Sequence, residues 1–422
     1  MRKSIVRLAQ ASIVLGIGMA IAAGVSQSSP WLGAVARVQG VVGEDTRHQG
    51  HFVNQNTGDV AWTLAPAYAA TAGETVGYEL SDKAYTPNND KGDLDDYHCF
   101  LVDPQLAADT FVTGVSIKPG NRKMVHHAIL YRVEPSQVPE ALERNKNGAG
   151  WTCFTGTGLT SRGTGNTAVN PESLGAGSAW VGAWVPGAKG FNTPSGIGVP
   201  IKKGSMLVMQ VHYNLANGLG TDQTSFELTY APKGSKLQAI RNHNLVAPVE
   251  LPCPETLQST ACQRERTLQK NADKIGAIGR MIPPGLLYLC DRKLEDYQKN
   301  VGDASNISTS CERRLQSDAT LYSVSGHMHL LGKQIKTELI SSNGTKTLLN
   351  IPKWDFHWQG DYWFVNPVEV KKGDILRVTC VHDNSAKNRP YVGSNPLEMR
   401  YITWGEGTSD EMCLSTVSMT SN

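Results

Sequence analysis

Two histidines one residue apart, His327 and His329, are the clearest candidates for chemistry in this sequence. They follow an apolar stretch, residues 319–324, whose residue types favour a β-strand. In a strand, residues i and i+2 point to the same face, so the two imidazoles would stand side by side. Such a pair suits a metal that prefers nitrogen ligands. Taken alone, the pair is equally compatible with a solvated strand face.

Other histidines fall in β-like segments. His126 and His127 are adjacent and follow a turn at residues 120–123. Adjacent strand residues face opposite sides, so both would reach one metal only if the strand starts, ends or bulges there. His212 lies in a clear strand, residues 204–214, on the same face as Gln210. A single strand histidine is usually a core or edge residue.

The remaining histidines carry weaker signals, and we interpret them as structural. The polar stretch 46–51 surrounds His48 and His51, which we expect at the surface. His98 sits beside a cysteine in a strand, and His382 follows another strand. The aromatic cluster at residues 354–358 is more typical of a core than of a ligand site.

Composition limits the class of protein that must position these residues. The chain has 422 residues, of which 18% are charged, and a formal net charge of +2. No basic run is present, so nucleic-acid binding has no electrostatic basis. The 42 glycines and many short Val/Ile/Thr/Tyr runs favour an all-β fold with many turns. A turn at residues 231–234 predicts a boundary between an N-terminal domain, 46–232, and a C-terminal domain, 233–422.

The N-terminus has the pattern of a secretory signal. Met1, Arg2, Lys3 and Arg7 precede an apolar run over residues 11–25 that ends in small residues. We predict a signal peptide at 1–25, a spacer at 26–45 and a secreted or periplasmic product. An uncleaved signal anchor is the alternative, but the apolar run is at the short end for a spanning helix. No other stretch could cross a membrane, so no stable insertion is expected after signal removal.

The cysteines agree with export. There are eight, none in a Cys-x-x-Cys motif. An even number in an oxidising compartment predicts disulfides rather than a thiolate metal site, although the connectivity does not follow from the sequence. Phosphate-binding glycine loops, Gly-x-Ser-x-Gly elbows and His-Glu-x-x-His motifs are absent from the sequence.

The order of the motifs carries a resemblance. His126-His127 follow a turn, Gln210-Val211-His212-Tyr213 come next, His327-x-His329 precede Leu-Gly-Lys, and residues 407–413 read Gly-Thr-Ser-Asp-Glu-Met-Cys. This set, spanning about residues 95–420, resembles the copper type II, ascorbate-dependent monooxygenases. That family includes peptidylglycine α-hydroxylating monooxygenase and dopamine β-monooxygenase.

The resemblance implies two antiparallel, jelly-roll-like β-sandwich domains packed side by side, each binding one copper across a solvent-filled cleft. It implies an electron-transfer copper on His126, His127 and His212, and an oxygen-activating copper on the catalytic set His327, His329 and Met412. Gln210 matches the glutamine two residues before the family's third first-domain histidine and is assigned to cofactor binding. The implied disulfides are Cys99–Cys153 and Cys380–Cys413, with the order among the other four left open, namely Cys253, Cys262, Cys290 and Cys311.

The implied activity is hydroxylation of a C–H bond in a small or short-chain organic substrate, with O₂ and a one-electron reductant such as ascorbate. Imidazole suits copper in both oxidation states, and the Met412 thioether favours Cu(I). A disulfide at Cys413 would hold Met412 in place. The alternative is an exported copper-binding or electron-transfer protein without hydroxylase activity.

The sequence departs from the peptide-amidating relatives where substrate is recognised. Those members carry an arginine two residues before the His-x-His pair, where this chain has Ser325. They also carry an asparagine and a tyrosine two and four residues after the methionine, where this chain has Leu414 and Thr416. A glycine-extended peptide is therefore not the expected substrate.

Overall fold

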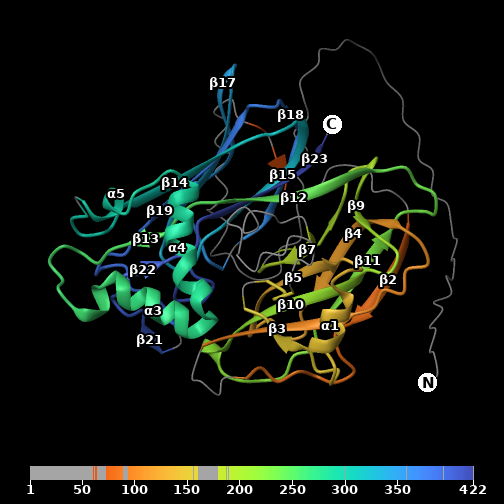
Figure 1. Ribbon diagram of the computed structural model, residues 1–422, viewed down its shortest axis with the longest axis horizontal. Coiled ribbons are helices and arrows are strands. Elements are labelled where there is room, and N and C mark those ends of the chain that lie inside the picture. Colours follow the sequence, from red (N-terminus) through yellow and green to blue (C-terminus); the bar gives the residue numbers. More distant parts are fainter. Residues whose placement is uncertain are drawn as a thin grey trace, which may run out of the picture. The chain divides into compact units, whose positions relative to one another are not determined.

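The computed structural model describes residues 60, 62–63, 73–88, 94–154, 156–159, 179–186, 188, 190–299, 301–357, 359–392 and 394–421. Most of its regular structure is antiparallel β-sheet (Figure 1). Within these ranges, no helix combines the length and apolar character needed to cross a membrane. The predicted signal peptide and spacer, together with His48 and His51, lie outside the described residues.

The first half of the chain forms a sandwich of two sheets. One sheet has the order β9-β4-β11-β2, with β8 beside β4, and the other has the order β6-β3-β10-β5-β7. Side chains of both sheets, such as Phe226 and Met209, share one core. The strands are β2 (Glu74–Glu79), β3 (Asp95–Val102), β4 (Thr110–Lys118), β5 (Val125–Val133), β6 (Trp151–Thr152), β7 (Trp180–Trp184), β8 (Phe191–Asn192), β9 (Ile197–Ile201), β10 (Met206–Asn214) and β11 (Ser225–Tyr230).

The second half forms another sandwich, with sheet orders β1-β18-β15-β23-β12 and β14-β19-β16-β17. Burial along β19 alternates residue by residue, as expected for a strand with one face in the core. The strands are β1 (Trp62–Thr63), β12 (Gln238–Val246), β14 (Ile307–Arg314), β15 (Ala319–His327), β16 (Gly332–Ser341), β17 (Gly344–Ile351), β18 (Asp361–Val370), β19 (Ile375–His382) and β23 (Leu414–Ser421).

Short elements complete the structure. Two small sheets each consist of two short strands. β13 (Glu250–Leu251) pairs with β22 (Ile402–Thr403), and β20 (Tyr391–Val392) pairs with β21 (Asn395–Pro396). The helices are α1 (Val138–Arg144), η3 (Leu215–Asn217), η4 (Thr260–Cys262), α3 (Arg264–Ile275), α4 (Ala277–Leu289) and α5 (Glu295–Gln298). Gly276 separates α3 from α4 at a φ of 74°, a backbone conformation that favours glycine and allows the sharp turn.

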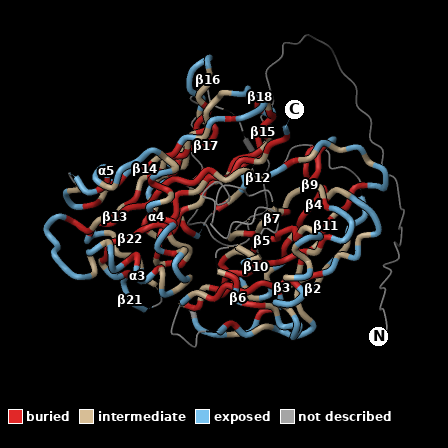
Figure 2. The backbone as a smooth tube through the Cα atoms, viewed as in Figure 1, coloured by how far each residue is buried: buried red, intermediate tan, exposed pale blue. Residues whose placement is uncertain are grey.

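The two halves are linked through their sheets. β12 pairs with β23 over most of its length, while Gln238 and Ala239 at its start pair in parallel with β9. β1 pairs with β18, although it precedes all the strands of the first half in sequence. In Figure 2 the buried segments follow the strands, whereas the turns between them are exposed. The predicted all-β fold with two sandwich domains is confirmed.

Four disulfides cross-link the structure. Cys99–Cys153 and Cys380–Cys413 form the two pairs that the resemblance implied. The remaining four cysteines pair as Cys253–Cys262 and Cys290–Cys311, which the sequence had left open. A framework of this kind indicates an oxidising environment outside the cytoplasm.

Candidate metal centre

A β-bulge brings three histidines of the first half together. In the pairing of β10 with β5, His212 lies opposite His127 and Tyr213 opposite Val125, so His126 is the extra residue. The strand therefore bulges here, one of the three arrangements that would let both histidines reach one metal, and the bulge turns them toward one point. The Nδ1 atom of His126 lies 3.2 Å from that of His127 and 3.3 Å from that of His212, and the last two are 3.4 Å apart.

These distances fit a bound metal ion. Three nitrogens held at a metal–nitrogen distance of about 2.0–2.1 Å with tetrahedral angles lie about 3.3 Å from one another. The His212 Nε2 lies 2.9 Å from Asp95 Oδ1, which leaves its Nδ1 lone pair directed at the cluster when Nε2 donates its proton. Hydrogen bonds among the three Nδ1 atoms could not satisfy all of them, whereas one metal ion could bind all three. The donor set suits copper, for which imidazole is a good ligand.

The electrostatics of the first cluster keep the rings of His126 and His127 neutral. Burial, followed by the charges of neighbouring histidines, holds the pKa of His126 and of His127 well below the usual value. Burial by itself would raise the pKa of Asp95, but hydrogen bonds from His212 and Thr408 lower it below its ordinary value. Asp95 is therefore an ionised acceptor that orients His212.

His327 is the last residue of β15 and His329 lies just after the strand, and in this pair the Nε2 atoms, rather than the Nδ1 atoms, are available for a metal. His327 Nδ1 lies 2.7 Å from Gln359 Oε1, and His329 Nδ1 lies 3.1 Å from the carbonyl oxygen of Asp410. Both acceptors require an N–H on Nδ1, so Nε2 of each ring is left with a lone pair. The ring centroids are 5.1 Å apart. Burial lowers the pKa of His327 to about 3, so this ring is also neutral.

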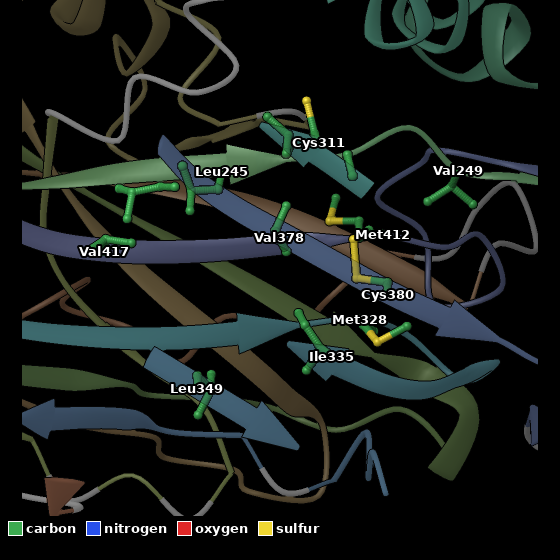
Figure 3. Packing of buried hydrophobic residues seen from close by; sticks show 14 of the residues in the cluster. Leu245, Val249, Cys311, Met328, Ile335, Leu349, Val378, Cys380, Met412 and Val417 are labelled. Carbon is green, nitrogen blue, oxygen red and sulfur yellow. A yellow bond between two sulfur atoms is a disulfide. The ribbon is translucent and has the colours of Figure 1, made fainter. Parts of the chain in front are cut away.

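The segment around Met412 is anchored from several directions. Buried Glu411 accepts hydrogen bonds from the backbone N–H groups of His329 at 3.0 Å and Leu331 at 2.6 Å. His382 Nε2 lies 3.5 Å from this carboxylate and 3.3 Å from the Met412 carbonyl oxygen. Figure 3 shows Met412 and Cys380 within the same packed cluster of apolar side chains. Glu411 thus ties the turn after His327 to the chain that carries Met412.

One cavity of about 310 Å³ adjoins both histidine groups. Its walls include His127 from the first half and His327, His329 and Met412 from the second. The rings of His127 and His327 have centroids 6.2 Å apart, and His126 stacks on Phe356 at 4.3 Å. The two groups therefore lie next to each other, closer than the open cleft implied by the resemblance.

Comparison with protein families separates the chain into two matched regions. Residues 83–219 match the N-terminal domain of the copper type II ascorbate-dependent monooxygenases, and residues 291–421 match their C-terminal domain. Together the matches cover more than half of the chain. The chain belongs to the copper type II ascorbate-dependent monooxygenase family.

Comparison with solved structures adds little to this family assignment. Paenibacillus xanthan lyase is 12% identical over 86% of this chain and 26% of its own, with a TM-score of 0.17. Procruciferin from Brassica napus is 10% identical over 86% and 85% of the two chains, with a TM-score of 0.15. These scores are too low to support any statement on fold or function. No curated protein matches the sequence.

Within this copper monooxygenase family member, Gln210 lines the cavity but is already engaged. Its Nε2 donates to the carbonyl oxygens of Cys153 at 2.7 Å and Gly156 at 3.0 Å. Both N–H donors are thus used to hold the loop that follows the first disulfide. Only its Oε1, 3.5 Å from the Tyr131 hydroxyl, would face a cofactor.

Several residues around the histidines gave no signal in the sequence. Asp95, Gln359 and Phe356 lie far along the chain from the histidines they contact, so spacing could not reveal them. Glu411 is next to Met412, but adjacency did not show that its carboxylate reaches back to the His327–His329 turn. His98 packs on Tyr85 and Phe100 and takes no part in either histidine group.

Proposed function

We propose that this chain is a two-copper monooxygenase that hydroxylates a C–H bond of a small or short-chain organic substrate. O₂ and a one-electron reductant such as ascorbate would be the co-substrates. His126, His127 and His212 would hold the first copper, and His327, His329 and Met412 the second. The observation that carries the proposal is the convergence of three Nδ1 atoms at 3.2–3.4 Å, beside two rings that keep Nε2 free.

Copper at these sites would supply the one-electron chemistry with O₂ that C–H hydroxylation needs. The chain's own residues would orient the ligands and shape the cavity. Asp95, Gln359 and the Asp410 carbonyl fix which nitrogen of each ring faces the metal. Glu411 and the Cys380–Cys413 disulfide hold the backbone at Met412, whose side chain lines the same cavity as His327 and His329. The largely apolar cavity wall keeps water away from the reacting C–H bond.

Metal analysis tests the ligand sets. The wild-type protein should bind two copper ions, whereas His126→Ala and Met412→Ala should each lose one, from different sites. His357→Ala is the matched control, because His357 is 73% exposed and outside both groups, and it should keep two. The ligand assignment fails if His126→Ala or Met412→Ala retains both ions.

Activity separates the two classes of function. A monooxygenase consumes O₂ only with reductant and couples that consumption to a hydroxylated product. An exported copper-binding or electron-transfer protein would bind both ions and exchange electrons, but its O₂ uptake would never be coupled to product across a broad panel of C–H substrates.

We further propose that residues 1–25 direct export and that the mature protein is secreted or periplasmic, which N-terminal sequencing of the exported protein would check.

A further inference from the structure

The candidate ligand rings differ in what holds the nitrogen that faces away from the metal. His212, His327 and His329 each keep this outer nitrogen within 2.7–3.1 Å of an oxygen acceptor. In His126 the outer nitrogen is Nε2, because its Nδ1 lies in the first histidine group. This Nε2 is buried and has no hydrogen-bond partner among the described residues. With Nδ1 on a metal, Nε2 carries the proton, so a buried N–H is left unpaired and another contact must fix the ring.

An aromatic side chain supplies that contact. The Phe356 ring stacks on His126, with centroids 4.3 Å apart and an interplanar angle of 18°. The two residues are 6% and 7% exposed, and neither lines the large cavity. The stack therefore fixes the plane of the imidazole without bonding to Nε2 and covers one of its faces.

The loop between β17 and β18 that carries Phe356 is itself fixed to the second histidine group. At its start, Trp354 Nε1 donates to the His329 carbonyl oxygen at 3.1 Å. At its end, Gln359 Nε2 donates to the Phe356 carbonyl oxygen at 2.8 Å, while Gln359 Oε1 lies 2.7 Å from Nδ1 of His327. The rings of Phe356 and His329 are nearly perpendicular, at 78°, with centroids 5.9 Å apart. One loop thus contacts ligands of both groups.

The surroundings of His126 have a consequence for the metal. A hydrogen-bond acceptor on the outer nitrogen makes an imidazole a more basic ligand, and an apolar surrounding limits the access of water. His126 lacks the acceptor and has an apolar ring on its face. A weaker donor in a drier site favours Cu(I) over Cu(II).

We propose that Phe356 is a positioning residue for the first copper, which orients His126 by stacking and keeps its Nε2 dry, so that this copper is biased toward Cu(I). The proposal rests on the proposed function, because it takes His126, His127 and His212 as copper ligands. The bias makes the first copper easier to reduce by a mild one-electron reductant. It also assigns a role to an aromatic cluster whose sequence is typical of a core.

Variants of Phe356 test the proposal in full-length protein that also carries Met412→Ala, so that only the first copper is bound. Phe356→Leu keeps an apolar side chain but removes the flat ring. It should weaken Cu(I) binding by about twofold to tenfold, the range for a lost aromatic stack, and lower the reduction potential as water reaches Nε2. Phe356→Tyr keeps the ring and should restore both.

Pulsed electron paramagnetic resonance of the Cu(II) form gives a direct readout, because the modulation from each outer imidazole nitrogen depends on its hydrogen bond. Without any change at Phe356, this protein should show at least one outer nitrogen that lacks a hydrogen bond. Phe356→Leu should convert its signal to that of a hydrogen-bonded nitrogen. Three hydrogen-bonded outer nitrogens before substitution would refute the proposal, whether or not the variants fold.

Phe226→Leu is the matched control, since Phe226 is a buried ring stacked on Tyr78 at 5.0 Å and 21°. It lies on β11, in the sheet that carries none of the histidine ligands. This change should lower stability but leave the affinity, potential and nitrogen signals of the first copper unchanged. If Phe356→Leu behaves in the same way, the ring is only structural and the proposal is wrong.

Failure of the proposed function is distinguishable from failure of this inference. If His126→Ala binds as much copper as the wild type, the ligand assignment fails and the role of Phe356 fails with it. If His126→Ala loses one copper but Phe356→Leu leaves the affinity and potential of the first copper unchanged, only the role of Phe356 is refuted.

Discussion

At the scale of single residues, Glu411 has the most connected side chain near the histidines. It is fully buried and accepts hydrogen bonds from the backbone of His329, Leu331 and Met412. Burial alone would raise the pKa of this carboxyl, but hydrogen bonding and charge from His382 lower it, so Glu411 is ionised. Glu411 does not line the cavity. It acts by holding the backbone that follows His327 together with the backbone at Met412.

Glu411→Gln should lower the free energy of unfolding by about 1.5–3 kcal/mol, the range for hydrogen bonds to charged groups. It should also weaken copper binding at the second site and leave the first site unchanged. Chemical denaturation and site-resolved copper titration measure the two effects. Glu398→Gln, at an exposed position, is the matched control. Equal loss of copper from both sites would contradict a local positioning role.

His98 gives a pH-dependent prediction. Burial lowers its pKa below the usual value, and only part of this is offset by the hydrogen bond to Ala149. In the unfolded chain His98 takes up a proton below about pH 6.5, whereas in the folded protein it does so only at lower pH. The unfolded state then binds more protons, so stability is lost as the pH falls through this window and is unaffected above it.

The expected measurement is the difference in free energy of unfolding between the wild type and His98→Gln. This difference should be constant between pH 7 and 8 and should shrink as the pH falls from 6.5 to 5. A difference that grows on acidification would show that the sign is wrong.

At the scale of elements, the α3–α4 hairpin lies in the segment between the two family-matched regions and forms part of the cavity wall. The helices approach closely at Gly279, where a Cβ atom would lie 2.3 Å from the Asn271 carbonyl oxygen. The Asn271 side chain in turn donates to Thr403 Oγ1 at 3.0 Å, which fixes the hairpin to β22. Close helix packing therefore determines the position of Lys274 and Ile282 in the wall.

Gly279→Ala should destabilise the protein by about 1–3 kcal/mol, because the added methyl group forces the backbones of the two helices apart. Thermal unfolding with copper-loaded protein measures it. Gly77→Ala is the control, since its nearest contact would be an ordinary 4.0 Å from the Glu227 side chain. A Gly279→Ala protein as stable as the control would show that the helices tolerate separation.

At the scale of the whole molecule, contacts between the two halves hold the histidine groups close together. Asp95 on β3 accepts from the Thr408 backbone N–H at 3.0 Å, and the Tyr97 hydroxyl donates to the Glu406 carbonyl oxygen at 2.5 Å. Both donor–acceptor pairs bring the loop before Met412 onto the first half. The 6.2 Å between the rings of His127 and His327 follows from this docking.

Two Cu(II) ions bound in this arrangement should couple magnetically, because dipolar coupling falls steeply with distance. The electron paramagnetic resonance spectrum of the doubly loaded protein should therefore be broader than the sum of the spectra of His126→Ala and His327→Ala. If the doubly loaded spectrum equals that sum, the two groups are farther apart in solution than the structure places them.

The sequence by itself determined the local features. Alternating apolar residues and turn signals predicted an all-β protein, and the ordered histidine and methionine motifs identified the family and six candidate ligands. Strand geometry also indicated that His126 and His127 could act together only where the strand starts, ends or bulges, and the structure has a bulge there. These inferences succeed because side-chain direction along a strand has a fixed period of two.

The tertiary structure alone decided the partners that lie far apart in the chain. The Asp95–His212 pair is 117 residues apart in sequence, and His329 and Glu411 are 82 residues apart. The register of β15 against β18 placed Asp361 beside Ser325, and no local pattern encodes that register. Strand pairing between distant segments is set by the packing of the whole sheet, so the residues that meet on the cavity floor became visible only in the folded chain.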